Sequence, residues 1–142
     1  MITTGKDEKM DYENRFLLKI PVIDEQHAEF FRLIDETFLN IQKEEELTMQ
    51  RSIALIKVLE DYLKYHLLYE EALMEKANYP DIEKHILQHK YFINKIEEYK
   101  LEISYNSPFL MNKLIGFMKK WFLFHIIQTD SQYKDDVTKI IN

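Results

Sequence analysis

The sequence contains no cysteine, only two glycines and only three prolines. Without cysteine, disulfides and metal sites with thiolate ligands are excluded. Because tight turns depend on glycine and proline, their scarcity argues against a β-rich fold. Long apolar runs are also missing: the most apolar stretch, residues 121–127, is far too short to span a bilayer. Residues 1–14 lack the apolar segment of a secretory signal.

What remains is a chain of 142 residues, of which 46% are hydrophobic, and this is enough for one domain with a real core. The net charge of −6 disfavours non-specific binding to nucleic acid or to an anionic membrane. We therefore expect one domain over residues 1–142, in a soluble, cytoplasmic and monomeric protein. We expect neither nucleic acid nor membrane as a partner.

Apolar residues recur at helical spacing in four segments of the chain. The first expected helix starts within residues 21–24 and ends near residue 42, and the other three cover about residues 49–77, 80–104 and 108–125. Asp24 is the expected N-cap of the first helix and Thr48 that of the second. Four long helices with short connections predict an all-α, up-down-up-down antiparallel four-helix bundle over about residues 21–130. An N-terminal arm over residues 1–15 and a short helix after residue 131 complete the expected fold.

All five histidines lie on or beside the apolar stripe of an expected helix, as do two carboxylates. One such histidine is more often a satisfied core residue than a metal ligand. Five of them, together with two carboxylates, would be costly to bury without a compensating ion. The pairs His66/Glu70 and His85/His89 are each four residues apart, so each pair projects from one helix face. The candidate metal ligands are His27, His66, Glu70, His85, His89, His125 and Asp130.

The spacing of the last two candidates is unusual. His125 and Asp130 are five residues apart, which is roughly 140° around an ideal helix. Either the helix ends or bulges between them, or Asp130 is a surface residue. The spacing alone leaves both interpretations open.

The number of candidate ligands predicts more than one ion. A structural zinc site needs four ligands, so seven are too many for a single zinc. Two ions can use all seven if the carboxylates bridge them, and five histidines then divide three and two. With one bridging solvent oxygen, one ion is six-coordinate and the other keeps a vacant position, where a small diatomic molecule would bind. Ferritin-like di-iron bundles differ, because they use Glu-x-x-His and more carboxylates than histidines.

The combined pattern resembles the hemerythrins, specifically the single-domain bacterial type called bacteriohemerythrin. The resemblance covers roughly residues 16–133. The matching stretches are Ile20–His27, His66-x-x-x-Glu70-Glu71-x-x-Met74, Tyr79-Pro80 before His85-x-x-x-His89, and Trp121-x-x-x-His125-Ile126 with Asp130 and Tyr133.

The resemblance implies a non-haem di-iron site that binds O2 reversibly, in an oxygen carrier or store and not an enzyme, with a protein recipient of O2 as a further partner. It implies that His85, His89 and His125 hold the saturated iron, that His27 and His66 hold the open one, and that Glu70 and Asp130 bridge. One alternative is a sensor that acts through a partner protein when oxygen or redox state changes. A di-iron enzyme acting on peroxide or nitric oxide is another.

The neighbours of the candidate ligands also lead to expectations. Phe30, Phe31 and Phe122 are expected to form the wall of the O2 pocket. Glu71 is expected to point away from the site into solvent. Tyr133 either donates a hydrogen bond to a bridging carboxylate or has a surface or capping role, and the sequence does not distinguish the two.

Overall fold

The protein is described by a computed structural model that covers residues 18–44, 46, 48–103 and 108–141. Its elements are α2 (Pro21–Lys43), α3 (Met49–Lys76), α4 (Ile82–Ile103), α5 (Pro108–His125), the π-helix η1 (Ile126–Asp130) and α6 (Ser131–Ile141).

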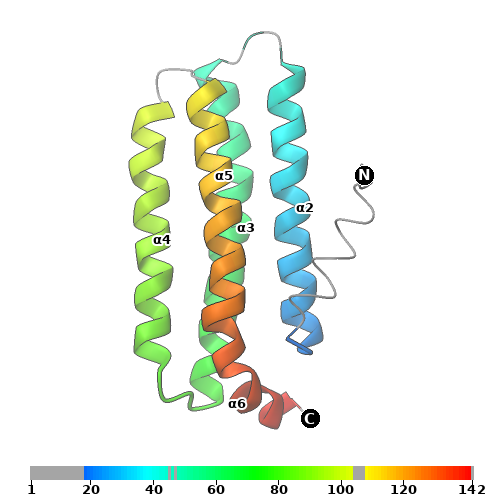
Figure 1. Cartoon of the computed structure of the whole chain (residues 1–142), viewed down its shortest axis with the longest axis vertical. Coiled ribbons are helices and arrows are strands. Elements are labelled where there is room, and N and C mark those ends of the chain that lie inside the picture. The colour runs from blue at the N-terminus through cyan, green and yellow to red at the C-terminus, as the bar shows by residue number, and fades with distance from the viewer. Residues whose placement is uncertain (1–17, 45, 47, 104–107, 142) are drawn as a thin grey trace.

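Helices α2 to α5 stand side by side, and each runs antiparallel to the helix before it (Figure 1). Both α2 and α4 pack against α3 and against α5. This arrangement confirms the predicted four-helix bundle, and α6 confirms the short C-terminal helix, which packs against α3 at one end of the bundle. The expected N-terminal arm lies outside the described residues. Within the described ranges, no helix has both the length and the apolar character needed to cross a membrane.

The start of α2 corrects the prediction for Asp24. The helix begins at Pro21, whose ring presets a helical backbone angle, and Ile20 is the N-cap residue. Asp24 therefore lies inside the first turn. Its carboxylate accepts a hydrogen bond of 2.9 Å from the backbone N–H of Leu18 and so ties the preceding segment to the helix.

The end of α3 is determined locally. Asn78 has a left-handed φ of 54°, a conformation that asparagine tolerates better than most residues. The N–H of Tyr79 then donates to the carbonyl oxygen of Met74 at 3.0 Å, and the N–H of Asn78 donates to the carbonyl oxygen of Glu75 at 3.1 Å. These two bonds form a Schellman motif, which ends the helix and lets the chain turn back into α4.

Two apolar clusters fill the bundle. The central cluster includes Phe30, Phe31, Leu63, Leu67, Phe92, Met111 and Phe122. The end cluster consists of Leu18, Ile20, Ile23, Met74, Tyr79, Tyr133 and Val137. On α2, His27 lies between Ile23 of the end cluster and Phe30 of the central cluster. The candidate ligands thus form a polar layer between two apolar ones.

Candidate metal centre

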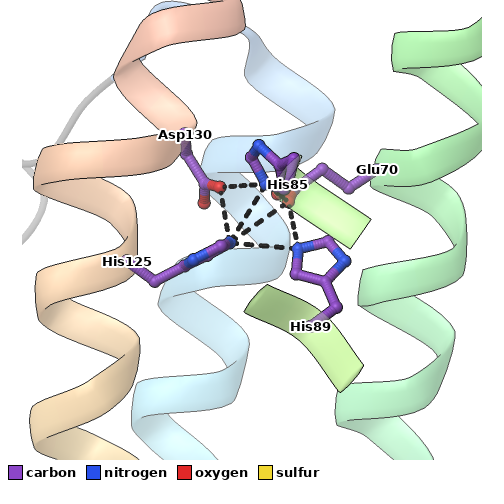
Figure 2. Close-up of side chains that lie close together, drawn as sticks. All are labelled: Glu70, His85, His89, His125 and Asp130. Carbon is purple, nitrogen blue, oxygen red and sulfur yellow. Dashed lines mark hydrogen bonds and ion pairs between the residues drawn. The ribbon is translucent and has the colours of Figure 1, made fainter. Parts of the chain in front are cut away.

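The structure brings all seven candidate ligands together. Each side chain is buried, and none is more than 4% exposed. Figure 2 shows five of them converging: Glu70 comes from α3, His85 and His89 from α4, His125 from α5 and Asp130 from η1. His27 of α2 and His66 of α3 complete the layer, so every helix of the bundle contributes.

The seven side chains form two overlapping groups, in each of which the ligand atoms lie within 4.8 Å of one another. The three-histidine group consists of His85, His89, His125, Glu70 and Asp130. The two-histidine group consists of His27, His66, Glu70 and Asp130. Both carboxylates belong to both groups.

The two oxygens of Glu70 face different groups. Its Oε1 lies 2.8 Å from His85 Nε2 and 3.0 Å from His89 Nε2, in the three-histidine group. Its Oε2 lies 3.2 Å from His66 Nε2 and 3.9 Å from His27 Nε2, in the two-histidine group. One carboxylate therefore offers one oxygen to each group.

Asp130 divides its oxygens in the same way. Its Oδ1 lies 2.9 Å from Nε2 of both His85 and His125, and its Oδ2 lies 3.3 Å from Nε2 of His27. The π-helix makes this possible, because the backbone N–H of Ser131 bonds to the carbonyl of Ile126 five residues back. The widened turn brings Asp130 inward beside His125, which answers the question that their spacing left open.

Several polar atoms of this layer lie close to one another without forming hydrogen bonds, as the ligand atoms of a metal site do. Buried Nε2 atoms of His27 and His66, and both oxygens of Asp130, have no hydrogen bond of adequate geometry despite their short distances. The Nε2 atom of His125 lies 3.0 Å from that of His89 and 3.1 Å from that of His85. Adjacent nitrogens bound about 2.1 Å from one octahedral ion are separated by about 3 Å. The donor set therefore fits a metal ion in each group.

Burial and mutual charge set the protonation of the layer in the metal-free protein. Burial alone would raise the pKa of both carboxyl groups, but the surrounding histidines hold the pKa of Glu70 and Asp130 below the usual range. Burial lowers the pKa of His66. Burial also acts to lower the pKa of His27 and His125, but the nearby carboxylates of Glu70 and Asp130 outweigh it. They raise the pKa of His27 to about 9 and that of His125 to about 10. Protons thus compete with a metal for these nitrogens.

The position of Glu71 contradicts its expected solvent exposure. Its Oε2 lies 2.8 Å from Nδ1 of His89, and the side chain is only 24% exposed. Helix α4 packs beside α3 on this flank, so the carboxylate of Glu71 meets the imidazole of His89. With Nδ1 donating to Glu71, the lone pair of His89 Nε2 faces the three-histidine group.

Two glutamines have the same role, and sequence reasoning missed both. Nδ1 of His66 donates to Gln26 Oε1 at 2.7 Å, and Nδ1 of His125 donates to Gln88 Oε1 at 3.3 Å. Gln26 occupies an inward position one turn before Phe30, which is the only signal in the sequence. Gln88 is 37 residues from its partner, so nothing local points to it.

Tyr133 resolves the alternatives that the sequence left open. Its hydroxyl donates a hydrogen bond of 3.1 Å to Glu70 Oε2, and its side chain is 1% exposed. Burial raises the pKa of Tyr133 well above its ordinary value, so the hydroxyl keeps its proton. Tyr133, a residue of the end cluster, therefore helps to fix the position of the Glu70 carboxylate.

Aromatic rings enclose the two-histidine group. The ring of Phe122 makes edge contacts with His27 and His66, at centroid distances of 5.4 and 5.5 Å. Phe30 and Phe31 pack behind it, at 4.5 and 5.5 Å from its centroid. These three rings therefore line the side of the layer where a pocket wall was expected.

Comparison with known proteins agrees with this geometry. The model of the hemerythrin HHE cation binding domain matches residues 18–136. A bacteriohemerythrin of Stenotrophomonas maltophilia is 30% identical over 125 residues, covering 87% of this chain and 78% of that protein. A bacteriohemerythrin of Clostridium acetobutylicum is 26% identical over 126 residues, or 87% and 98% of the two chains. A myohemerythrin of Theromyzon tessulatum is 26% identical over 127 residues, or 89% and 92%.

Proposed function

This chain belongs to the hemerythrin family, and from that premise we propose that it binds two iron ions and takes up O2 reversibly, as an oxygen carrier or store. It acts as a single hemerythrin-like domain and as a binding protein rather than an enzyme. When bound, the iron ions supply the redox chemistry and the coordination position that O2 requires.

The division of the carboxylate oxygens is the observation that carries this proposal. Because each carboxylate offers one oxygen to each group, Glu70 and Asp130 could be shared between two ions. His85, His89 and His125 would hold one ion together with these carboxylates. His27 and His66 would hold the other, with one protein donor fewer and therefore room for a small ligand.

The surroundings of that free position suit an uncharged diatomic ligand. The ring of Phe122 lies against both histidines of the four-donor group, and Phe30 packs behind it. An apolar wall excludes water and free protons, which favours release of O2 unchanged. Among the described residues, neither group includes a carboxylate beyond the two shared ones.

An optical titration of iron-loaded protein tests the proposal. The protein is loaded with about two irons per chain, reduced without oxygen, exposed to air and then swept with inert gas. A near-ultraviolet and visible charge-transfer band that appears in air and disappears on sweeping is the expected result. Zinc-loaded protein is the control and should give no band. A band that persists on sweeping while hydrogen peroxide accumulates would contradict reversible binding.

A further inference from the structure

A groove of about 370 Å³ runs between α3 and α4 on the outer surface of the bundle. It is lined by Lys64, Leu67, Leu68, Glu71, Ile86, His89, Lys90, Ile93 and Asn94. The volume falls within the range of small-molecule sites. The groove lies outside the layer of candidate ligands and touches it only through His89 and its partner Glu71.

Most of the groove surface is apolar. Four aliphatic side chains line it, and Leu68 is 67% exposed although it projects from the middle of a helix. Leaving such a side chain in water costs free energy that an apolar ligand would recover. The groove therefore favours a ligand with an apolar body.

The charged side chains of the groove favour an anion. Lys64 and Lys90 line it from α3 and α4, and among the described residues neither has a carboxylate partner. Lys57 and Lys95 on the same helices do have partners, in ion pairs with Asp61 and Glu98.

The one carboxylate of the groove offsets only part of this charge. Glu71 keeps its negative charge, but it faces Nδ1 of His89, and the two lysines outnumber it. Two free ammonium groups thus flank an apolar surface on a protein whose net charge is −6.

From this combination we propose that the groove binds an amphipathic carboxylate, such as a medium-chain fatty acid. Its carboxylate pairs with Lys64 and Lys90, and its apolar chain lies on Leu67, Leu68 and Ile93. The binding site is separate from the O2 site, and its occupation does not depend on iron.

Calorimetric titration of the full chain with sodium decanoate, below its micelle concentration, tests the proposal. Saturable binding of one molecule per chain is expected for both iron-loaded and zinc-loaded protein. Decanol and decyltrimethylammonium have the same chain length without the negative charge, and each should bind at least about tenfold more weakly. Binding that is no tighter for decanoate than for decanol would overturn the proposal.

Variants locate the site. The double variant Lys64→Glu/Lys90→Glu is expected to weaken decanoate binding about tenfold, and Leu68→Glu to weaken it by a similar factor. Lys84→Glu and Leu87→Glu are the matched controls, because both residues are exposed on α4 and neither lines the groove. They should leave the affinity unchanged. Equal losses in the control variants would show binding outside the groove and contradict the proposal.

Nuclear magnetic resonance of the diamagnetic zinc-loaded protein supplies a second, independent readout. Decanoate should shift the methyl signals of Leu67, Leu68, Ile86 and Ile93 and leave that of Met111, which is in the first turn of α5 and does not line the groove, in place. Shifts confined to other methyl groups would overturn the proposal. Because zinc carries no O2, this result is unaffected if reversible O2 binding fails.

Discussion

The three-histidine and two-histidine groups share both carboxylates but have different surroundings. In the first, His89 and His125 donate from Nδ1 to Glu71 and Gln88. The ring of Trp121 also stacks on His125, at a centroid distance of 4.5 Å and an interplanar angle of 14°. In the second, Phe122 contacts both imidazoles, and His66 alone has a polar outer partner.

This difference separates two tasks within one layer. Hydrogen bonds from the outer nitrogens fix the tautomer and orientation of His89 and His125, two of the three-histidine ligands, which suits an ion that is held permanently. Aromatic rings around the other group provide weaker orientation but keep water out, which suits an ion that must accept and release a small uncharged molecule. The three-histidine and two-histidine groups therefore differ in function although their donor atoms are similar.

The largest effect is expected from removing a carboxylate that both groups share. Glu70 lies within 4 Å of all five histidines, so Glu70→Gln removes an anionic ligand from both ions and leaves the buried imidazoles without their counter-charge. The iron content of reconstituted protein should fall from about two to less than one per chain. Plasma mass spectrometry measures this ratio, and circular dichroism checks the fold.

Glu71→Gln is the control for that change, because it alters only the outer partner of one ligand. Loss of such a partner typically weakens metal binding about 10- to 100-fold, which competition with a chelator detects while both ions still load at high iron. If Glu70→Gln and Glu71→Gln lost the same amount of iron, Glu70 would not bridge the two groups.

A smaller and one-sided effect is expected from opening the aromatic wall. Phe122→Ala removes a fully buried ring and should lower the free energy of unfolding by about 3–5 kcal/mol. Water then reaches the two-histidine group, and the oxygenated form should oxidise irreversibly roughly tenfold faster. Urea unfolding and the decay of the charge-transfer band measure the two quantities.

Trp121→Ala provides the matched change on the other side. It also removes a large ring, which is half-buried and packs against the core, and so lowers stability, but Trp121 contacts His125 of the three-histidine group. Its irreversible oxidation rate should stay within about twofold of the parent protein. Equal acceleration by both variants would mean that general loosening, and not the wall at Phe122, controls oxidation.

The charges of the layer also impose a pH dependence on the stability of the metal-free protein. Without metal, the pKa of His27 and His125 is raised to about 9 and about 10, from 6.5 in the unfolded chain. Their contribution to stability is therefore complete below pH 6.5 and is lost as the pH rises through 9 to 10. His66, whose pKa is lowered, is neutral in both states above about pH 7.5 and does not oppose this trend.

Metal loading should reverse the sign of that dependence. Protons and metal compete for the same nitrogens, so the loaded protein gains stability with rising pH where the metal-free protein loses it. Thermal unfolding between pH 7 and 10, with zinc and with a chelator, measures both slopes. If stability changed with pH in the same way with zinc and with chelator, the metal would not be displacing protons from His27 and His125.

Much of this protein follows from its sequence, because the decisive patterns are local. The apolar stripes, the break at Asn78 and the four-residue spacing of His66 and Glu70 depend only on the geometry of a helix and its ends. They predict the bundle and bring the candidate ligands to its interior. The expected N-cap at Asp24 was wrong, because the N-cap is Ile20, four residues earlier, and the helix begins at Pro21.

Tertiary structure decided what depends on segments far apart in the chain. The π-turn that carries Asp130 inward lies at the junction of α5, η1 and α6. The oxygen that each carboxylate offers to each group depends on histidines of other helices. The partners Gln26–His66 and Gln88–His125 are 40 and 37 residues apart, and Glu71 meets His89 across two helices. Periodicity determines which way a side chain faces, but its neighbour is determined only when another helix packs against it.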